Sequence, residues 1–166
     1  MAKVIILSGP VQSGKTTTLM EWVEERNDVV GFLCPDINQV RHLYMIESGS
    51  LHPFEANGVH DEPTIQIGRF TFYTSGFKTV KSWLSKSAES DARWIIIDEI
   101  GKLELAGEGF EPELSRFIDS VRRNVYNPTL IIVVREQLLN QVIDKYQLHD
   151  AVKSDILNFG NVILTY

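Results

Sequence analysis

The chain contains 166 residues, 43% of them hydrophobic, which is enough apolar material for one domain with a substantial core. Acidic residues outnumber basic residues by 22 to 16 and no long basic run occurs, so the composition argues against a nucleic-acid-binding surface. The first apolar run is too short for a signal peptide, and no later stretch approaches the length of a membrane span.

The first predicted elements are a strand, a glycine-containing loop and a helix. Residues 3–8 are a short apolar run rich in β-branched side chains, which is typical of a buried strand. Apolar residues then recur at a helical spacing, so residues 15–26 are predicted to form a helix. The loop between them, GPVQSGKT, has the spacing G-x-x-x-x-G-K-T. This strand–loop–helix context favours a phosphate-binding loop over a plain strand-to-helix turn.

The residue types of this loop suit phosphate binding. Gly9 and Gly14 permit backbone angles that other residues avoid, so the loop can turn its N–H groups inward toward an anion. Lys15 is expected to contact the β- and γ-phosphates, and the Thr16 hydroxyl is expected to bind Mg²⁺. Thr17 is a candidate for contact with the α-phosphate. The expected nucleotide-binding residues are Gly9, Pro10, Val11, Gln12, Ser13, Gly14, Lys15, Thr16 and Thr17.

The next predicted strand, residues 29–34, ends at the single cysteine. Cys34 has no partner for an internal disulfide, which indicates a reducing, cytoplasmic compartment, and its place after an apolar run predicts a small buried side chain. Residues 35–64 contain no convincing helix and are predicted to include two short strands that meet in a hairpin about residues 48–50. Such a long irregular insertion is usually functional or mobile. Arg41 in this insertion could reach over a nucleotide or a substrate.

The second motif is RWIIIDEIGKLEL, residues 93–105. Residues 94–98 are predicted to be a strand whose C-terminal end carries Asp98 and then Glu99. Ligands of parallel α/β sheets gather at that edge of the sheet. Asp98 is therefore expected to hold Mg²⁺ together with Thr16, and Glu99 to polarise the water that attacks the γ-phosphorus. The alternative is that Asp98 and Glu99 are surface carboxylates at the end of a strand with no role in catalysis. The presence of a phosphate-binding loop in the same chain favours the catalytic roles.

A third strand end carries an arginine. Arg135 directly follows the apolar run LIIVV, so its guanidinium can face the site and stabilise the charge that develops on the γ-phosphate. A position at the surface is an equally good interpretation. Arg122 and Arg123 lie on a predicted helix and are expected to be solvated.

The remaining elements complete an alternating pattern. The predicted strands are 3–8, 29–34, 65–73, 94–98, 129–134 and 161–165, and the predicted helices are 15–26, 76–88, 112–125 and 137–147. The runs WIIID and LIIVV are apolar throughout, as expected for strands buried on both faces of a parallel sheet. The order predicts an α/β fold with a mainly parallel sheet, helices on both faces and a β-hairpin-type insertion.

Other chemistries have weaker support. Four histidines show no close metal-ligand spacing: His42, His52, His60 and His149. Five aromatic residues could stack a nucleotide base, although core packing is the preferred interpretation: Tyr44, Phe54, Phe70, Phe72 and Tyr73. The guanine-reading motif N-K-x-D and the transporter motif L-S-G-G-Q are both absent from the sequence.

The segment IDEIGKLEL, residues 97–105, resembles the Asp-Glu-Ile-Gly-Lys-Met-Glu-Leu signature of the small P-loop nucleoside-triphosphatases. That family is found in thermophiles and includes the cancer-related nucleoside-triphosphatase. The segments SGPVQSGKTTTL, VVGFLCPDINQVRHLYMI and IGRFTFYTSGF are also similar to it, so the resemblance spans most of the chain. The loop departs from the family pattern Gly-x-Pro-Gly-x-Gly-Lys-Thr, because Pro10 is displaced and the third glycine is missing.

The resemblance implies a RecA-like P-loop nucleoside-triphosphatase domain over residues 1–166. It implies Mg²⁺-dependent hydrolysis of ATP, GTP and other nucleoside triphosphates to the diphosphate and phosphate, with broad base tolerance. Lys15 and Thr16 would bind phosphate and metal, Asp98 would serve the metal and Glu99 would activate water. Glu104 belongs to the same signature, and a structural carboxylate is the favoured interpretation. The expected catalytic residues are Lys15, Glu99 and Arg135.

Two other functions stay open beside hydrolysis. One is a P-loop kinase that moves the γ-phosphate to a small acceptor held under residues 35–64. The other is a nucleotide-binding adapter with poor turnover that acts through a protein partner, as in molybdenum-cofactor assembly. Kinase lids usually gather several arginines, whereas residues 35–64 contain only Arg41. The neighbouring Asp98 and Glu99 suit water activation, so hydrolysis is favoured. Neither a nucleic acid nor a membrane is an expected partner.

Overall fold

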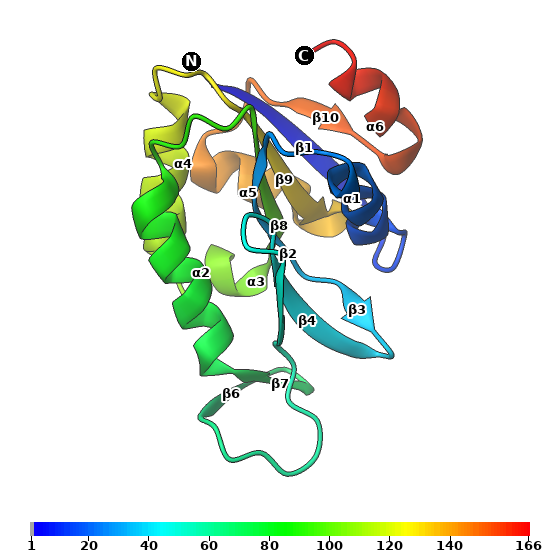
Figure 1. Ribbon diagram of the computed structural model, residues 1–166, viewed down its shortest axis with the longest axis vertical. Helices are drawn as coiled ribbons and strands as arrows, with labels where there is room; N and C mark the ends of the chain where they lie inside the picture. Colours follow the sequence, from blue (N-terminus) through cyan, green and yellow to red (C-terminus); the bar gives the residue numbers. More distant parts are fainter. Residues whose placement is uncertain (1) are drawn as a thin grey trace.

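The computed structural model describes residues 2–166, which are built around an eight-stranded sheet (Figure 1). Its strands are β1 (Lys3–Gly9), β2 (Val29–Leu33), β3 (Asp36–Ile37), β4 (Val40–Met45), β5 (Ser50–Pro53), β8 (Trp94–Ile100), β9 (Thr129–Arg135) and β10 (Val152–Ser154). The order is β10-β1-β9-β8-β2-β4-β3, with β5 paired to β4. The pairs from β10 to β2 are parallel, and those that involve β4 are antiparallel.

Helices cover both faces of the sheet. They are α1 (Lys15–Glu24), α2 (Thr74–Ser87), α3 (Lys102–Leu105), α4 (Glu113–Arg122), α5 (Leu139–Tyr146) and α6 (Ile156–Ile163), with a 3-10 turn η1 (Glu136–Leu138) before α5. Figure 1 shows α1 and α6 on one side of the sheet and α2, α4 and α5 on the other. The predicted α/β fold, with a mainly parallel sheet, is therefore confirmed.

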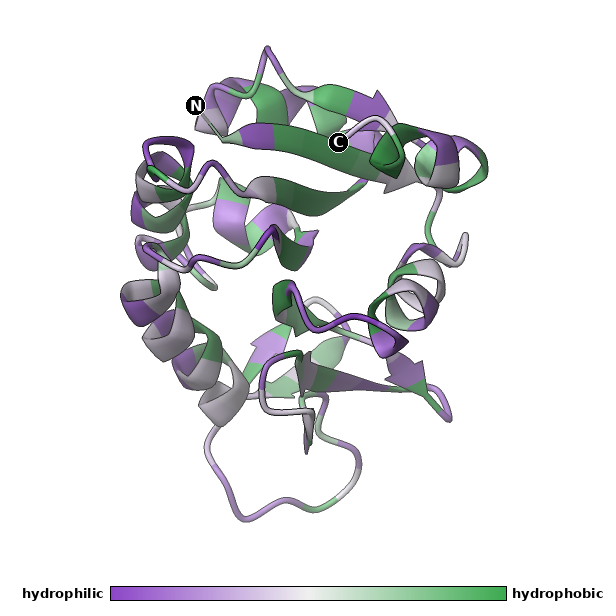
Figure 2. Cartoon of the chain, turned by 45° about the horizontal axis from the view of Figure 1, so that its top comes forward, coloured by the Kyte–Doolittle hydropathy of each residue, from purple (hydrophilic) through white to green (hydrophobic). Residues whose placement is uncertain are grey.

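Period-two alternation of the strands creates two cores. On β8, Ile95 and Ile97 pack into the core under α2, α4 and α5, whereas Trp94 and Ile96 pack under α1 and α6. Because the parallel strands are buried on both faces, almost every residue along them is apolar. Figure 2 shows hydrophobic residues concentrated on the sheet and hydrophilic residues on the outer parts of the helices.

The insertion after β2 matches its prediction in outline. Residues 35–64 contain no helix, and β4 and β5 form an antiparallel hairpin that turns at residues 46–49. The predicted strand at residues 65–73 is two strands, β6 (Thr64–Ile67) and β7 (Phe70–Tyr73), which pair antiparallel. The turn between them contains Gly68 with φ of +61°, a conformation that glycine adopts without strain. This hairpin forms a small separate sheet.

The strand predicted at residues 161–165 is wrong. Residues 156–163 form α6, and the Asp155 side chain caps its first turn by accepting a hydrogen bond from the Asn158 N–H at 2.8 Å. Phe159 is buried and meets the Trp22 ring edge-on, with 5.8 Å between the ring centres. The apolar, β-branched composition of residues 161–165 favoured a strand. The Asp155 cap and the burial of Phe159 stabilise a helix instead. The last strand is instead β10, which pairs with β1.

Candidate active site

The candidate site lies at the C-terminal ends of three neighbouring parallel strands. Strand β9 lies between β1 and β8, and its Arg135 is in register with Gly9, the last residue of β1. The ladder between β8 and β9 shifts register between Ile97 and Ile100, at the two carboxylates. The peptide bond between Asp98 and Glu99 is cis. Parallel pairing therefore brings the loop, the carboxylates and Arg135 to one edge of the sheet.

The loop after β1 wraps around the ammonium group of Lys15. Lys15 Nζ donates hydrogen bonds to the carbonyl oxygens of Gly9 at 3.1 Å and Pro10 at 2.7 Å, and to Ser13 Oγ at 3.2 Å. Burial lowers the pKa of Lys15, whereas the nearby Glu99 and Asp98 carboxylates raise it. Gly14 has φ of +89° and stands directly before α1, so the first N–H groups of that helix open toward the loop.

A cavity of about 800 Å³ opens above the loop. It is lined by the seven loop residues 11–17 and, from other elements, by Arg41, Glu99 and Arg135. Of the predicted nucleotide-binding residues, the structure thus brings Val11, Gln12, Ser13, Gly14, Lys15, Thr16 and Thr17 to the cavity. Gly9 and Pro10 do not line it, and their carbonyl groups hold the Lys15 side chain instead.

Asp98 and Thr16 are in direct contact. Asp98 Oδ2 accepts a hydrogen bond from Thr16 Oγ1 at 2.7 Å and another from the Cys34 backbone N–H at 3.0 Å. Burial, together with the neighbouring Glu99 carboxylate, raises the pKa of Asp98 to about 6. A hydroxyl and a carboxylate oxygen are ligands that fit Mg²⁺. Among residues 2–166, no three His, Cys, Asp or Glu side chains could hold a metal together, so phosphate oxygens or water would complete the coordination.

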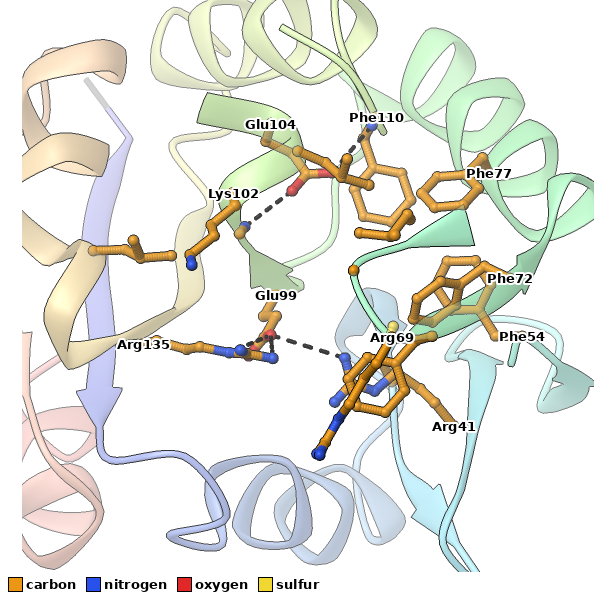
Figure 3. Close-up of a pocket in the computed structure, with 17 residues that line it drawn as sticks. Arg41, Phe54, Arg69, Phe72, Phe77, Glu99, Lys102, Glu104, Phe110 and Arg135 are labelled. Atoms are coloured by element: carbon orange, nitrogen blue, oxygen red, sulfur yellow. Dashed lines mark hydrogen bonds and ion pairs between the residues drawn. The ribbon is translucent and has the colours of Figure 1, made fainter. Parts of the chain in front are cut away.

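Glu99 is held by two arginines. Its Oε1 accepts hydrogen bonds from Arg135 Nε at 3.0 Å and from Arg135 Nη2 at 2.9 Å, and Arg41 Nη1 lies 3.9 Å away (Figure 3). The Glu99 side chain is half-buried. The structure therefore turns Arg135 toward the site rather than toward solvent, and brings Arg41 from the insertion to the same carboxylate.

Two charged residues considered in the sequence analysis, Glu104 and Arg122, bind other parts of the chain and lie outside the cavity above the loop. Glu104 is buried and accepts hydrogen bonds from the N–H groups of Gly101 at 2.9 Å and Phe110 at 3.2 Å, so it ties down the chain around α3. The expectation of solvation holds for Arg123, which is exposed, whereas Arg122 is half-buried. Its guanidinium donates to the Gln147 carbonyl oxygen at 2.7 Å and pairs with Asp150 at 2.9 Å, because the end of α4 packs near the chain that follows α5.

The sequence did not predict Arg69 as a residue of the cavity wall, and it named Phe70 only as one of five aromatic residues that could stack a base. Arg69 and Phe70 lie at the turn of the β6–β7 hairpin and line the cavity above the loop. The sequence pattern predicts one continuous strand over this segment, which conceals the turn; Gly68 before them is the available signal. Cys34 also lines the cavity and is half-buried, and burial raises the pKa of its thiol well above its ordinary value.

A sequence-family model described as NTPase matches residues 4–159. The chain belongs to this NTPase family. No curated protein matches the sequence.

Two solved structures share the NTPase fold. The crystal structure of THEP1 from the hyperthermophile Aquifex aeolicus superposes with a TM-score of 0.67 at 20% sequence identity, and covers 95% of this chain and 92% of its own. The solution structure of a human cancer-related nucleoside triphosphatase also has a TM-score of 0.67, at 18% identity, and covers 99% of this chain and 97% of its own. The protein is thus a P-loop NTPase, as its sequence motifs predict. Within residues 2–166, no helix combines the length and apolar character that a membrane crossing needs.

Proposed function

We propose that this NTPase hydrolyses nucleoside 5′-triphosphates, ATP and GTP among them, to the diphosphate and phosphate. The reaction would depend on Mg²⁺ and tolerate different bases. The observation that carries the proposal is the position of Glu99, which lines the cavity above the loop beside Lys15, Asp98 and Arg135. A reducing, cytoplasmic setting would suit the single thiol of Cys34.

Each residue of the site has a role in this proposal. Lys15 and the N–H groups of the loop bind the β- and γ-phosphates. Thr16 and Asp98 would hold Mg²⁺, which when bound offsets the negative charge of those phosphates. Glu99 accepts a proton from water as the water oxygen bonds to the γ-phosphorus and the bond from that phosphorus to the bridging oxygen breaks. The electron pair leaves with the diphosphate.

Arg135 has two alternative partners in the reaction. In the structure its guanidinium is held by Glu99 Oε1 through Nε and Nη2. A γ-phosphate in the cavity would compete for the same guanidinium, because it carries more negative charge than a carboxylate and can accept two parallel hydrogen bonds from arginine. Transfer of Arg135 to the γ-phosphate would release Glu99 to accept the proton of water and would place positive charge where the transition state needs it.

Broad base tolerance has two supports. The N-K-x-D motif that reads guanine is absent from the sequence. In addition, the arginines and Glu99 that line the cavity lie near the expected phosphate end. Charged groups at that end recognise the triphosphate, which all nucleoside triphosphates share.

The first test measures phosphate release from ATP, GTP, CTP and UTP, with and without Mg²⁺ and with no added acceptor. We expect release from several nucleotides that requires Mg²⁺. Replacing Glu99 by glutamine (Glu99→Gln) should lower kcat by about 10²–10⁴-fold, as for loss of a positioned general base, and should preserve nucleotide binding. The matched control is Glu89→Gln, which changes an exposed glutamate after α2 in the same way.

Different outcomes contradict different parts of the proposal. Wild-type-like turnover of Glu99→Gln would show that another group is the base. Release from GTP alone would refute base tolerance. Tight nucleotide binding without any phosphate release would refute hydrolysis in favour of transfer to an acceptor or action through a protein partner.

A further inference from the structure

A second cavity, of about 320 Å³, adjoins the one above the loop. The two cavities share a wall that consists of Cys34, Arg41, Arg69, Phe70, Glu99 and Arg135. None of the loop residues 9–17 lines the second cavity. It therefore extends from Glu99 away from the phosphate-binding loop, toward α2 and α3 (Figure 3). Its volume lies within the range of pockets that hold small ligands.

One end of the second cavity is aromatic. Phe54, Phe72, Phe77 and Phe110 gather there, on the side opposite Arg135 (Figure 3). Their rings pack edge-on or tilted, with centres 5.1 Å apart for Phe54 and Phe72, 4.9 Å for Phe54 and Phe77, and 5.5 Å for Phe77 and Phe110. Because the rings support one another, this wall is formed before any ligand arrives, and it suits a flat apolar ring.

Apart from the phenylalanines, the lining of the cavity carries an excess of positive charge. Its lining includes Arg41, Arg69, Lys102 and Arg135 against two carboxylates, Glu99 and Glu104. Glu99 is paired with Arg135 and Arg41, and Glu104 is bound by two backbone N–H groups. Among residues 2–166, no carboxylate pairs with Lys102 or Arg69.

This cationic surplus favours an anionic ligand. The chain as a whole carries a net charge of −6, so an excess of positive charge at this place runs against its overall composition. Figure 3 shows Lys102 on the same side of the cavity as Arg135, with the phenylalanines on the opposite side. The cavity thus offers an apolar end and a cationic end to a single small molecule.

We propose that this cavity is a second ligand site that takes a small molecule with an apolar body of one or two rings and an anionic group. The rings lie against the phenylalanines and the anionic group lies beside Lys102. The inference rests on the proposed function in one respect: a nucleotide bound by the loop occupies the other cavity, so the two ligands bind together. The base of that nucleotide is attached beyond the α-phosphate, so the proposal places it at the end of the nucleotide remote from Glu99 and outside the second cavity.

The test uses naphthalene-2-carboxylate as the probe and 2-naphthylmethylammonium, which has the same rings and the opposite charge, as its counterpart. Binding to the full chain is followed by NMR titration, without nucleotide and with saturating Mg²⁺–ADP. We expect saturable binding of the carboxylate in both conditions, at least 10-fold tighter than that of the ammonium compound. Phosphate release is not a readout, so failure of hydrolysis does not imitate failure of this site.

Two variants locate the probe. Lys102→Glu should weaken carboxylate binding at least 10-fold, and this side chain is exposed, so the fold is not at risk. Ile67→Trp should fill the cavity from the β6–β7 hairpin and block both probes. The matched control, Lys86→Glu, reverses an exposed charge on α2 outside the cavity lining and should leave binding unchanged.

Four results would overturn the proposal. They are absence of saturable binding at millimolar probe, equal affinity for the two probes, displacement of the carboxylate by Mg²⁺–ADP, and full binding to both Lys102→Glu and Ile67→Trp. Displacement by the nucleotide would identify the second cavity as part of the nucleotide site. Failure of Mg²⁺–ADP itself to bind would contradict the proposed function, while the charge preference and the Lys102 dependence would still decide the present inference.

Discussion

Asp98 is almost completely buried at the end of β8, with 1% of its surface exposed, and its charge opposes folding. Its pKa rises from 3.8 to about 6 through burial and the adjacent Glu99. Well below pH 3.8 the Asp98 carboxyl is protonated in both the folded and the unfolded chain, so its burial carries no charge penalty. As the pH rises toward 6 the unfolded chain loses this proton first, so stability falls, and above pH 6 the full cost of about 3 kcal/mol is present.

We therefore predict that Asp98→Asn stabilises the protein at pH 7 in the absence of Mg²⁺. The amide oxygen can still accept hydrogen bonds from Thr16 and Cys34, and the buried charge is gone, so the free energy of unfolding should rise by about 2 kcal/mol. Urea unfolding at pH 7 and pH 4 measures this, and most of the gain should be lost at pH 4. Asp119→Asn, at an exposed position, is the control. Destabilisation by Asp98→Asn at pH 7 would show that the charge is favourable.

Residues that belong to a sequence motif were predictable one by one, and residues placed by packing were not. Lys15 and Thr16 follow from the spacing of the loop. For Arg135 the sequence left a position in the site and a position at the surface equally open, and its pairing with Glu99 in the structure decides between them. Arg69 depends on a hairpin turn that the sequence conceals, and Arg122 on how the end of α4 meets the chain after α5. Such contacts between distant segments leave no local pattern in the sequence.

Strand β2 passes β8 so closely that one of its positions requires glycine. Gly31 has φ of +122°, and a Cβ atom there would overlap the carbonyl oxygen of Ile96 on β8. We predict that Gly31→Ala lowers the free energy of unfolding by about 3 kcal/mol or more, because backbone strain adds to a clash with rigid backbone. Urea unfolding monitored by circular dichroism measures the loss.

A second glycine, Gly49, separates the cost of backbone strain from the cost of a steric clash. Gly49, in the β4–β5 turn, has φ of +64°, and a Cβ atom added there would have no other atom within 4 Å, so Gly49→Ala introduces strain without a clash. Its expected cost is about 1 kcal/mol. Equal costs for the two variants would mean that β2 and β8 separate easily, and would contradict the close approach of these strands.

The elements themselves were predictable where one physical signal dominated. Strands β8 and β9 are apolar throughout because both their faces are buried, and α4 repeats its buried residues at a helical spacing. The prediction for the segment 161–165 failed because a short run of apolar, β-branched composition suits a strand and a helix end equally well. What decides is Phe159, which lies outside the predicted range and packs against Trp22 of α1.

At the scale of the whole molecule, the site joins segments that are far apart in the chain. The loop before α1, Arg41 of the insertion, Asp98 and Glu99 of β8, and Arg135 of β9 meet at one cavity. The parallel strands hold three of these segments in place. The insertion, which pairs antiparallel with β2, and the β6–β7 hairpin also line the cavity. A nucleotide that contacts all of them would tie the two parts of the molecule together.

A bound nucleotide should therefore stabilise the entire fold. With a non-hydrolysable ATP analogue and Mg²⁺ at 100 times the dissociation constant, linkage adds about 2.7 kcal/mol to the free energy of unfolding. For a chain of this size that corresponds to a rise in Tm of about 5–10 °C. Lys15→Ala should abolish most of the rise at the same ligand concentration, since the buried ammonium is the expected phosphate contact. Comparing each variant with and without ligand removes any effect of the substitution on the free protein.

The control for this thermal experiment is Lys153→Ala, which removes an exposed lysine of β10 and should preserve the full ligand-induced rise in Tm. Mg²⁺ alone tests whether the metal binds without phosphate, and only a small rise is expected, because Thr16 and Asp98 supply too few ligands by themselves. An undiminished rise in Lys15→Ala would place the nucleotide elsewhere on the molecule. A rise with Mg²⁺ alone as large as that with the nucleotide would instead mean that the protein supplies a complete metal site.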